Sequence, residues 1–416
     1  MILDLVQRAS PGLHATTGRR FFGWVIGASH PIGVAADWLT SACGQNAGNH
    51  TASPAAAAVE TISAQWLLDL LDLPREASVG FVTRATVANF VCLAAARGVV
   101  LRRVGWDVER NGLFGAPPIH VLIGDEAHAA VFSALQFLGL GYDRVTRIET
   151  DTQGRILPEV FAQALARCQE PTIVVTQAGQ INTGAFDAYS IIIPQARANG
   201  AWVHVDGAFG LWARACPGRA DLGRGKEAAD SWATDGHKWL QTPNDCGYAI
   251  VRDADAHRRA MTSAASYLPG ISEGERDPSH HVPERSRRAR GFPTWAMLRH
   301  LGREGIASMV ETQCLLAQRL AEHLTGEPGI RIVNDVVLNP MIVRSGADEP
   351  TLDGDSPTLR TIRRIQDDAI LFAGGARWKG EWVIRLSVVS APTTVEDVDR
   401  SAEAILKARR DIRSSR

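Results

Sequence analysis

Short apolar runs alternate with longer amphipathic stretches between residues 78 and 206. The runs are rich in β-branched residues, as buried strands are, and the stretches between them have helical spacing. We expect strands at residues 79–83, 119–123, 145–148, 172–177 and 202–206. We expect helices at residues 86–97, 129–138, 158–168 and 187–199. Strands that alternate with helices in this way form βαβ crossovers, so the pattern predicts an α/β fold with a mostly parallel sheet.

The pattern changes on both sides of this region. Apolar residues recur with helical spacing over residues 55–73, which predicts a long helix. Residues 265–292 are rich in Gly, Pro, Ser, His and charged residues and show no regular spacing, which predicts a long loop. A long helix is expected at 295–324, followed by strands at 330–333, 338–343 and 382–389 and helices at 358–371 and 395–407. The chain is therefore predicted to have an amino-terminal segment (1–55), a large α/β domain (56–294), and the long helix with a smaller α+β domain (295–416).

The composition is that of an ordinary folded protein of 416 residues, with 45% hydrophobic and 21% charged residues. Lys plus Arg number 44 and Asp plus Glu 45, so the net charge of −1 supplies no positive field for nucleic acid. No apolar stretch is long and continuous enough for a membrane span, and no signal peptide opens the chain. The six cysteines form no CxxC pair. We expect free thiols, a cytoplasmic location, and neither a nucleic-acid nor a membrane partner.

The chain contains only four lysines, which are Lys226, Lys238, Lys379 and Lys407. Charged or turn-forming neighbours surround three of them, so we expect those three to face solvent. Lys238 instead lies between His237 and the apolar pair Trp239 and Leu240, where we expect it to be desolvated. Desolvation lowers the pKa of an amine, and a neutral amine attacks an aldehyde to form a Schiff base.

Two further residues lie where parallel strands are expected to end. Asp206 closes the strand at 202–206, and His128 follows the strand at 119–123. Ligands of such sheets bind at the carboxyl ends of the strands. A strand-end aspartate beside a reactive lysine is what pyridoxal phosphate requires, because a close carboxylate keeps the ring nitrogen protonated. A capping aspartate and a structural histidine are the alternatives, and the residues alone leave them open.

Signals for a phosphate site and for a metal site are weaker. Thr86 lies at a strand-to-helix turn where backbone N–H groups and a hydroxyl could meet a phosphate, although an ordinary helix cap has the same pattern. His204 with Asp206, and His280 with His281, belong to no HExxH or CxxC set, and no GxGxxG or GxxxxGK[ST] motif occurs at a strand end. We therefore expect neither a metal site nor a nucleotide site.

In order along the chain, these motifs resemble the pyridoxal-phosphate group II amino-acid decarboxylases, the family of aromatic-amino-acid, tyrosine and glutamate decarboxylases. The resemblance extends from about residue 20 to residue 405, and its most specific parts are HVDGA at 204–208 and DGHKWL at 235–240. Further matches lie at 21–23, 53–55, 86–89, 125–128, 182–187, 229–232, 286–290 and 385–388. The resemblance implies a type I pyridoxal-phosphate (aspartate aminotransferase-like) fold, pyridoxal 5'-phosphate as cofactor, and a homodimer with its active site at the interface.

The resemblance also implies a role for each matching residue. Lys238 would be the Schiff-base lysine, Asp206 the partner of the ring nitrogen, and His128 the ring that stacks on the cofactor. The other implied contacts to the ring or the phosphate side are Ala208, Ala85, Thr86, His237 and Asn182.

The sequence departs from the family pattern at several positions. Arg84 replaces a small residue before the phosphate turn, Val87 replaces a usual glutamate, and Gln180 replaces a usual threonine. The loop after residue 267 lacks the tyrosine with which aromatic-class members protonate the carbanion, and His280 and His281 lie near that place. We name His281 as the candidate proton donor. Diversion of the reaction to an aldehyde, and two solvated histidines, are the alternatives.

We therefore expect pyridoxal-phosphate-dependent decarboxylation of an L-amino acid to an amine and carbon dioxide. The alternatives are decarboxylation coupled to oxidative deamination, transamination, and a dimeric scaffold without cofactor. Phe22, Trp24 and His30 suggest an aromatic or apolar substrate, but core packing explains the first two equally well. Arg385 is a candidate to meet the substrate carboxylate, with a surface position as the alternative. The sequence does not choose among aromatic, acidic and unusual amino acids.

Overall fold

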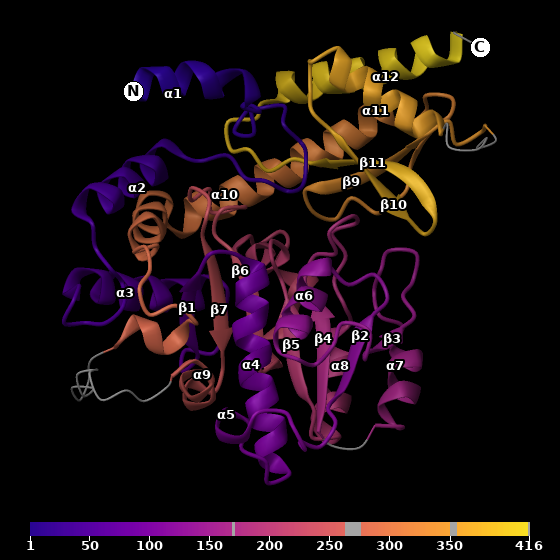
Figure 1. The fold of residues 1–416 in the computed structure, drawn as a ribbon. Helices are drawn as coiled ribbons and strands as arrows, with labels where there is room; N and C mark the ends of the chain where they lie inside the picture. Colours follow the sequence, from indigo (N-terminus) through magenta and orange to yellow (C-terminus); the bar gives the residue numbers. More distant parts are fainter. Residues whose placement is uncertain (169–170, 263–275, 350–355, 415–416) are drawn as a thin grey trace.

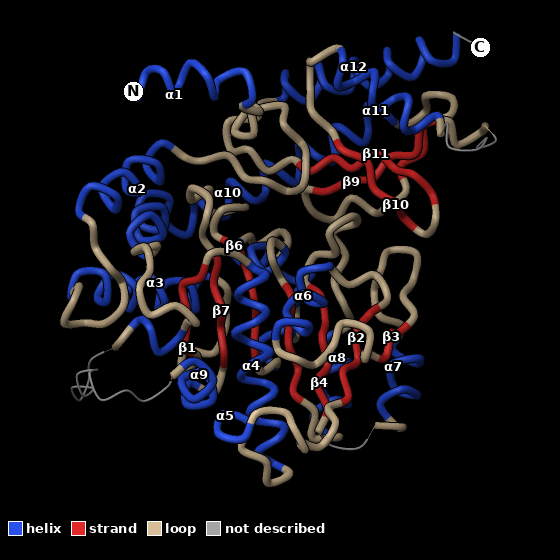
Figure 2. The backbone as a smooth tube through the Cα atoms, viewed as in Figure 1, coloured by secondary structure: helices blue, strands red, loops and turns tan. Residues whose placement is uncertain are grey.

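The computed structural model describes residues 1–168, 171–262, 276–349 and 356–414. Within these ranges the chain forms two sheets, a larger one below and a smaller one above in the view of Figure 1, with helices around both. Figure 2 shows that the strands of the large sheet are enclosed by helices on both faces. The strand order is β1-β7-β6-β5-β4-β2-β3 in the large sheet and β10-β11-β9-β8 in the small one.

The large sheet has a parallel centre. Strands β2 to β6 are parallel to one another, and β7 is antiparallel to both β6 and β1. The strands are β1 (Ser78–Val82), β2 (His120–Gly124), β3 (Thr146–Ile148), β4 (Thr172–Gln177), β5 (Trp202–Asp206), β6 (Ser231–Asp235) and β7 (Gly247–Val251). The expected mostly parallel sheet is therefore confirmed. Because parallel strands end at the same edge of a sheet, Gln177, Asp206 and Asp235 lie at one edge.

Helices cover both faces of this sheet. One face packs against α4 (Ala85–Arg103), α6 (Ala129–Phe137) and α9 (Ala254–Met261), and the other against α7 (Pro158–Leu165) and α8 (Tyr189–Ala198). A short helix, α5 (Val108–Asn111), follows α4. Among the described helices, α4 alone has the length and apolarity to cross a membrane, yet 67% of its apolar window is buried inside the protein. We therefore interpret α4 as a core helix.

The small sheet belongs to the carboxy-terminal part of the chain. Its strands are β8 (Ile330–Ile332), β9 (Pro340–Ser345), β10 (Gly374–Trp378) and β11 (Glu381–Ser387), and they pack against α11 (Pro357–Asp367) and α12 (Val395–Ser414). The long helix α10 (Gly291–Leu324) leads to this sheet and is interrupted at Gly302, whose φ is +60°. Glycine adopts this left-handed conformation without a steric penalty.

The amino-terminal segment packs against both parts of the protein. It forms α1 (Ile2–Ala9), α2 (Pro31–Cys43) and α3 (Pro54–Leu70). Phe22 is buried in the core of the small domain, where its N–H donates to the carbonyl of Phe372 at 2.9 Å. The predicted boundaries at residues 55 and 294 fall within the first turns of α3 and α10, and the division into three parts stays a prediction.

Candidate active site

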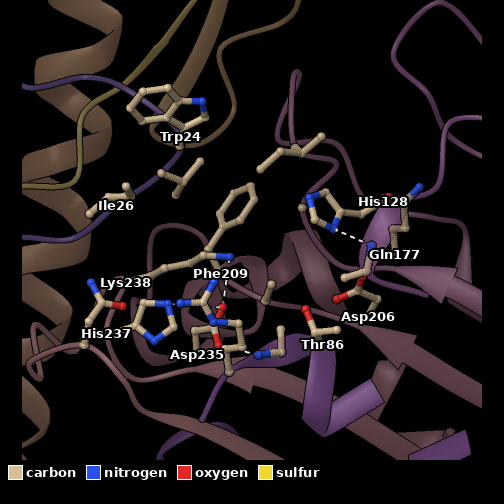
Figure 3. Close-up of a pocket in the computed structure, with 18 residues that line it drawn as sticks. Trp24, Ile26, Thr86, His128, Gln177, Asp206, Phe209, Asp235, His237 and Lys238 are labelled. Carbon is tan, nitrogen blue, oxygen red and sulfur yellow. Dashed lines mark hydrogen bonds and ion pairs between the residues drawn. The ribbon is translucent and has the colours of Figure 1, made fainter. Parts of the chain in front are cut away.

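A cavity of about 290 Å³ lies at the edge of the large sheet where the parallel strands end (Figure 3). Its volume is near the lower end of the range of ~300–1,000 Å³ that small-molecule sites occupy. The starts of α4 and α6, the ends of β4, β5 and β6, and residues 24–26 contribute to its walls. The lining includes seven of the eight predicted cofactor contacts, namely Lys238, Asp206, His128, Ala208, Ala85, Thr86 and His237.

Lys238 is held at the cavity wall by an ion pair. Its Nζ lies 3.0 Å from Oδ2 of Asp235, the last residue of β6, and the two side chains are only 13% and 3% exposed. The ring of Phe209 lies 5.9 Å from the same Nζ. Trp239 and Leu240, which follow the lysine, are fully buried and anchor this segment in the core. The apolar neighbours therefore fix the backbone, while Asp235 fixes the amine.

Asp206 presents a carboxylate oxygen that has no hydrogen-bond partner. The residue is 6% exposed, and its Oδ1 is buried without a donor among the described residues. Burial raises the pKa of this carboxyl above its usual value, and the charges of His128 and Lys238 act in the opposite direction. An unpaired buried carboxylate oxygen is unfavourable. The site therefore fits a ligand that brings an N–H donor or a positive charge to this oxygen.

His128 caps helix α6 and also lines the cavity. Its Nδ1 accepts the N–H of Ala130 at 3.1 Å, so the neutral ring carries its proton on Nε2. Burial lowers the pKa of this imidazole, which keeps the ring neutral. Figure 3 shows His128 and Lys238 entering the cavity from different sides. His128 is therefore a helix cap that also lines the cavity, and its contact with a planar ligand stays a prediction.

The start of α4 differs from a free phosphate turn. The N–H of Ala85 donates to Asp235 Oδ1 at 2.6 Å, so a carboxylate already uses this backbone donor. Thr86 and the positive end of the helix dipole still face the cavity. Arg84 also lines the cavity and adds positive charge there. The pKa of the neighbouring His237 is lowered first by burial and, among smaller effects, by the charge of Arg84.

Two predicted residues lie outside the cavity lining. Asn182 is buried in the turn after β4, where its N–H donates to Gln180 Oε1 at 2.6 Å. His281 belongs to the short 3-10 helix Pro278–His281, and its carbonyl accepts the Nε2–H of His257 at 2.9 Å. Burial holds the pKa of the His281 ring well below its usual value. The roles suggested for these two residues stay predictions.

The expectation that Lys226 faces solvent is wrong. Its side chain is 1% exposed, and Nζ donates to the carbonyl of Leu71 at 3.1 Å. Burial lowers the pKa of this amine to about 8. Lys238 is therefore not the only desolvated lysine. Charged neighbours in the sequence suggested exposure, but the aliphatic stem of Lys226 packs close to Gly223.

Several residues that line the cavity were not predicted from the sequence, among them Asp235, Gln177 and Phe209, and two predicted residues lie elsewhere. Asp235 and Gln177 both end strands, which was the signal that selected Asp206, and the Nε2 of Gln177 is buried without a partner. Phe22 lies in the small-domain core, and His30 caps α2 by accepting the N–H of Ile32. Neither Phe22 nor His30 lines the cavity.

Trp24 lines the cavity, whereas Arg385 is not one of its lining residues but lies close enough for its charge to act on His128. Trp24 is 53% exposed. Arg385 lies on β11, and its charge contributes to lowering the pKa of His128. Burial also lowers the pKa of the Arg385 guanidinium, and no described carboxylate pairs with it. It is therefore a cation available to a ligand.

Comparison with known proteins identifies the family. The sequence model of the pyridoxal-dependent decarboxylase conserved domain matches residues 1–344. The chain belongs to the pyridoxal-dependent decarboxylase family. Phenylacetaldehyde synthase of Arabidopsis thaliana is 27% identical over 427 residues, which cover 97% of this chain and 84% of that protein. Aromatic-L-amino-acid decarboxylase of Bacillus atrophaeus is 25% identical over 387 residues, which cover 91% and 78%.

The fold agrees with this family. The crystal structure of TDC from Oryza sativa with PLP and tryptamine matches with a TM-score of 0.90 at 23% identity, covering 98% of this chain and 88% of that one. The predicted type I pyridoxal-phosphate fold is confirmed. The protein described here is therefore an enzyme that uses pyridoxal 5'-phosphate to decarboxylate an amino acid, as expected from its sequence. The residues fit this cofactor, because the free oxygen of Asp206 can accept from its ring nitrogen and the amine of Lys238 can bind its aldehyde.

Proposed function

We propose that the cavity decarboxylates an L-amino acid with an aromatic side chain, and that Lys238, Asp206 and His128 are the main partners of the cofactor. One observation carries the assignment. The unpartnered Oδ1 of Asp206 and the amine of Lys238 line the same cavity at the carboxyl ends of β5 and β6. The side chain of Asn89 acts on this carboxylate as a hydrogen-bond donor, but Oδ1 has no partner among the described residues and is left for the ligand.

When bound, pyridoxal phosphate takes up the electron pair that departing carbon dioxide leaves behind. Asp206 would hold a proton at the ring nitrogen, because its Oδ1 is free to accept it. His128 provides a flat, neutral face whose orientation is fixed by the N–H of Ala130. Thr86 and Arg84 at the start of α4 provide a hydroxyl and a positive charge for the phosphate group.

Lys238 and Asp235 work as a pair. The amine of Lys238 would hold the cofactor through its aldehyde. Asp235 holds this amine at the cavity wall through the 3.0 Å contact seen in the structure. The lysine thus stays within reach of the reacting atoms.

Arg385 and Trp24 recognise the substrate in this proposal. A carboxylate needs a cationic partner, and Arg385 is an unpaired cation close to His128. Trp24 lies in an aromatic group at the mouth, with ring centroids 5.1 Å from Phe372 and 6.0 Å from Phe21. Such a surface favours an aromatic side chain. The Bacillus atrophaeus relative, named for aromatic L-amino acids, agrees with this choice.

A second outcome of the same site is an aldehyde. In that outcome the amino acid, molecular oxygen and water yield the aldehyde, carbon dioxide, ammonia and hydrogen peroxide. Two observations favour it: the loop has no tyrosine between residues 268 and 290, and a relative is named phenylacetaldehyde synthase. We place the amine first because the Bacillus atrophaeus relative is named an aromatic-L-amino-acid decarboxylase. The lowered pKa values of His280 and His281 make both rings weak proton donors unless the bound ligand raises those values.

We further propose a cytoplasmic homodimer. His281 lies outside the cavity of its own chain, so its part as a proton donor requires the loop of a partner subunit to reach this cavity. The six cysteines are all free, as is usual in a reducing compartment.

The test is a product assay with aromatic, acidic and basic L-amino acids, in which carbon dioxide, amine, aldehyde and hydrogen peroxide are all quantified. We expect equal amounts of amine and carbon dioxide, with the highest kcat/KM for an aromatic substrate. Trp24→Ala should reduce that preference, whereas the control Phe114→Ala, at a side chain that is 98% exposed, should not. A preference for acidic or basic substrates would overturn the substrate class. Aldehyde with equimolar peroxide would replace the proposed reaction by the second outcome.

A further inference from the structure

We propose that Lys379, at the tip of the hairpin between β10 and β11, is a positioning residue that fixes the turn carrying His128. The inference rests on the proposed contact of His128 with the cofactor. Lys379 is exposed, as expected, with 37% of its side chain accessible, and its amine still reaches residues of the large sheet's loops. Figure 1 shows this hairpin on the side of the small sheet that faces the loops after β2 and β3.

The lysine reaches the turn by two contacts. Its Nζ donates to Oγ1 of Thr150 at 2.9 Å and lies 3.7 Å from Oε1 of Glu126. The hydroxyl of Thr150 in turn donates to Oδ1 of Asp125 at 2.6 Å. Asp125 and Glu126 open the four-residue segment that ends at His128. One amine therefore restrains both residues at the start of this segment.

The large domain holds the same turn from the other side. The Nε2 of Gln180 donates to the carbonyl of Glu126 at 3.1 Å, and the N–H of Asp125 donates to the carbonyl of Ile148 at 2.9 Å. These contacts fix the backbone of the turn, whereas Lys379 fixes its acidic side chains. Glu126 is thus held between Gln180 of the large domain and Lys379 of the small one.

The local backbone does not explain a lysine at this position. Lys379 has φ +46° and Gly380 has φ +85°, which are the left-handed values of a two-residue hairpin turn. Asn, Asp and Gly favour the first position of such a turn, and a lysine there is strained. The contacts of its side chain across the domain boundary provide a reason for lysine. The preceding Trp378 also meets the large domain, because a Cβ on Gly154 would come within 2.9 Å of its ring.

The same hairpin leads to the second residue that acts on His128. β11 starts at Glu381, just after the tip, and carries Arg385, whose charge contributes to lowering the pKa of His128. A displacement of the hairpin would therefore move both Lys379, which restrains the turn before His128, and Arg385, the nearby cation. Through Lys379 the position of the small domain is coupled to the position of the His128 ring.

The test compares Lys379→Met with Lys379→Arg and with Lys407→Met, a matched control at an exposed lysine of α12. In the cofactor-free protein, Lys379→Met should speed hydrogen exchange in residues 124–130 and leave β1 unchanged. In the holoenzyme it should weaken the visible circular-dichroism band of the cofactor and lower kcat about tenfold, the scale expected for a misplaced ring. Lys379→Arg should behave like the wild type, and so should Lys407→Met.

His128→Ala separates a failure of this inference from a failure of the proposed function. If His128→Ala changes neither the circular-dichroism band nor kcat, the proposed contact of His128 is wrong and the inference falls with it. If His128→Ala changes both, but Lys379→Met matches the wild type in hydrogen exchange and circular dichroism, Lys379 is not a positioning residue. Loss of exchange protection throughout the chain in Lys379→Met, without rescue by Lys379→Arg, would likewise reduce its role to general stability.

Discussion

Asp235 Oδ2 lies 3.0 Å from Lys238 Nζ, within a cavity wall that leaves only 3% of the aspartate side chain exposed. The other oxygen of the same carboxylate accepts the N–H of Ala85 at 2.6 Å. One side chain therefore joins Lys238, the proposed Schiff-base lysine, to the start of α4, the proposed phosphate side. The position of the amine depends on this carboxylate, and substitution of Asp235 tests that dependence.

Asp235→Asn should lower kcat/KM by about tenfold to a hundredfold, because a hydrogen bond to a charged group contributes about 1.5–3 kcal/mol. The amide retains an oxygen for the N–H of Ala85 but loses the charge that faces Lys238. Steady-state kinetics on the holoenzyme measure the effect. Asp255→Asn, at an exposed ion pair on α9, is the matched control. A wild-type kcat/KM for Asp235→Asn would show that the ion pair has no part in placing the amine.

Asp206→Asn should reduce activity and yet stabilise the cofactor-free protein. We expect kcat to fall about a hundredfold or more, because an amide does not keep the ring nitrogen protonated. Burial raises the pKa of the Asp206 carboxyl in the folded protein. Its contribution to stability is therefore fully present below about pH 3.9, the pKa in the unfolded chain. This contribution is lost as the pH rises through the higher pKa of the folded protein. At pH 7 the variant should therefore be more stable, by about 1–3 kcal/mol.

Thermal unfolding of the cofactor-free proteins between pH 4 and pH 8 checks this sign. The stability difference between Asp206→Asn and the wild type should shrink toward pH 4. If Asp206→Asn lowers the melting temperature at pH 7, the carboxylate has partners within the protein and is not reserved for a ligand.

Lys226 predicts a pH dependence of stability at alkaline pH. Its pKa is about 8 in the folded protein, below the value of 10.5 for an exposed lysine. The unfolded chain therefore binds more protons between these values, and this group makes stability rise with pH from about 8 to about 10. The difference between these two pKa values, 10.5 and about 8, corresponds to ~3 kcal/mol in the free energy of unfolding.

Urea unfolding of the wild type and Lys226→Met at pH 7, 8.5 and 10 measures this contribution. The free energy of unfolding of the wild type, relative to the variant, should increase by about 2.5 kcal/mol over this range. Subtracting the variant removes the titration of cysteines and tyrosines that both proteins share. A pH-independent difference would mean that Lys226 stays charged in the folded protein.

Arg385→Met should raise KM for the amino acid about tenfold to a hundredfold, because a charge-assisted contact to the substrate carboxylate is lost. Inhibition by the corresponding amine, which has no carboxylate, should be unchanged. Arg377→Met on the neighbouring strand β10 serves as control, because its guanidinium stacks on Trp382. Equal losses of affinity for the amino acid and the amine would assign Arg385 to general packing of the site.

The parallel core of the fold was accessible from the sequence, but part of the sheet was not. β4 and β5 were predicted at their observed bounds because they are continuous runs of residues buried on both faces. β6 was missed because it contains a serine, a threonine and an aspartate, although it is equally buried. Ser231 is buried at low cost, since its Oγ accepts the indole N–H of Trp202 at 2.9 Å.

The residues of the site that lie in sequence motifs or at strand ends could be predicted from the sequence. Lys238, Asp206 and His128 were identified because each stands in a distinctive block or at the end of a strand. The contact of Asp235 with Ala85 joins residues 150 positions apart, and that of Lys226 with Leu71 joins residues 155 apart. Such contacts depend on how the elements pack, and no local pattern encodes them.

Borohydride reduction followed by peptide mapping shows directly whether Lys238 binds the cofactor. Lys226 makes the result informative, because burial lowers the pKa of its amine as well. We predict that the purified protein with pyridoxal phosphate loses its visible absorption band on reduction and that the label is found on Lys238. A label on Lys226, or a protein that stays colourless and unlabelled with added pyridoxal phosphate, would contradict the account.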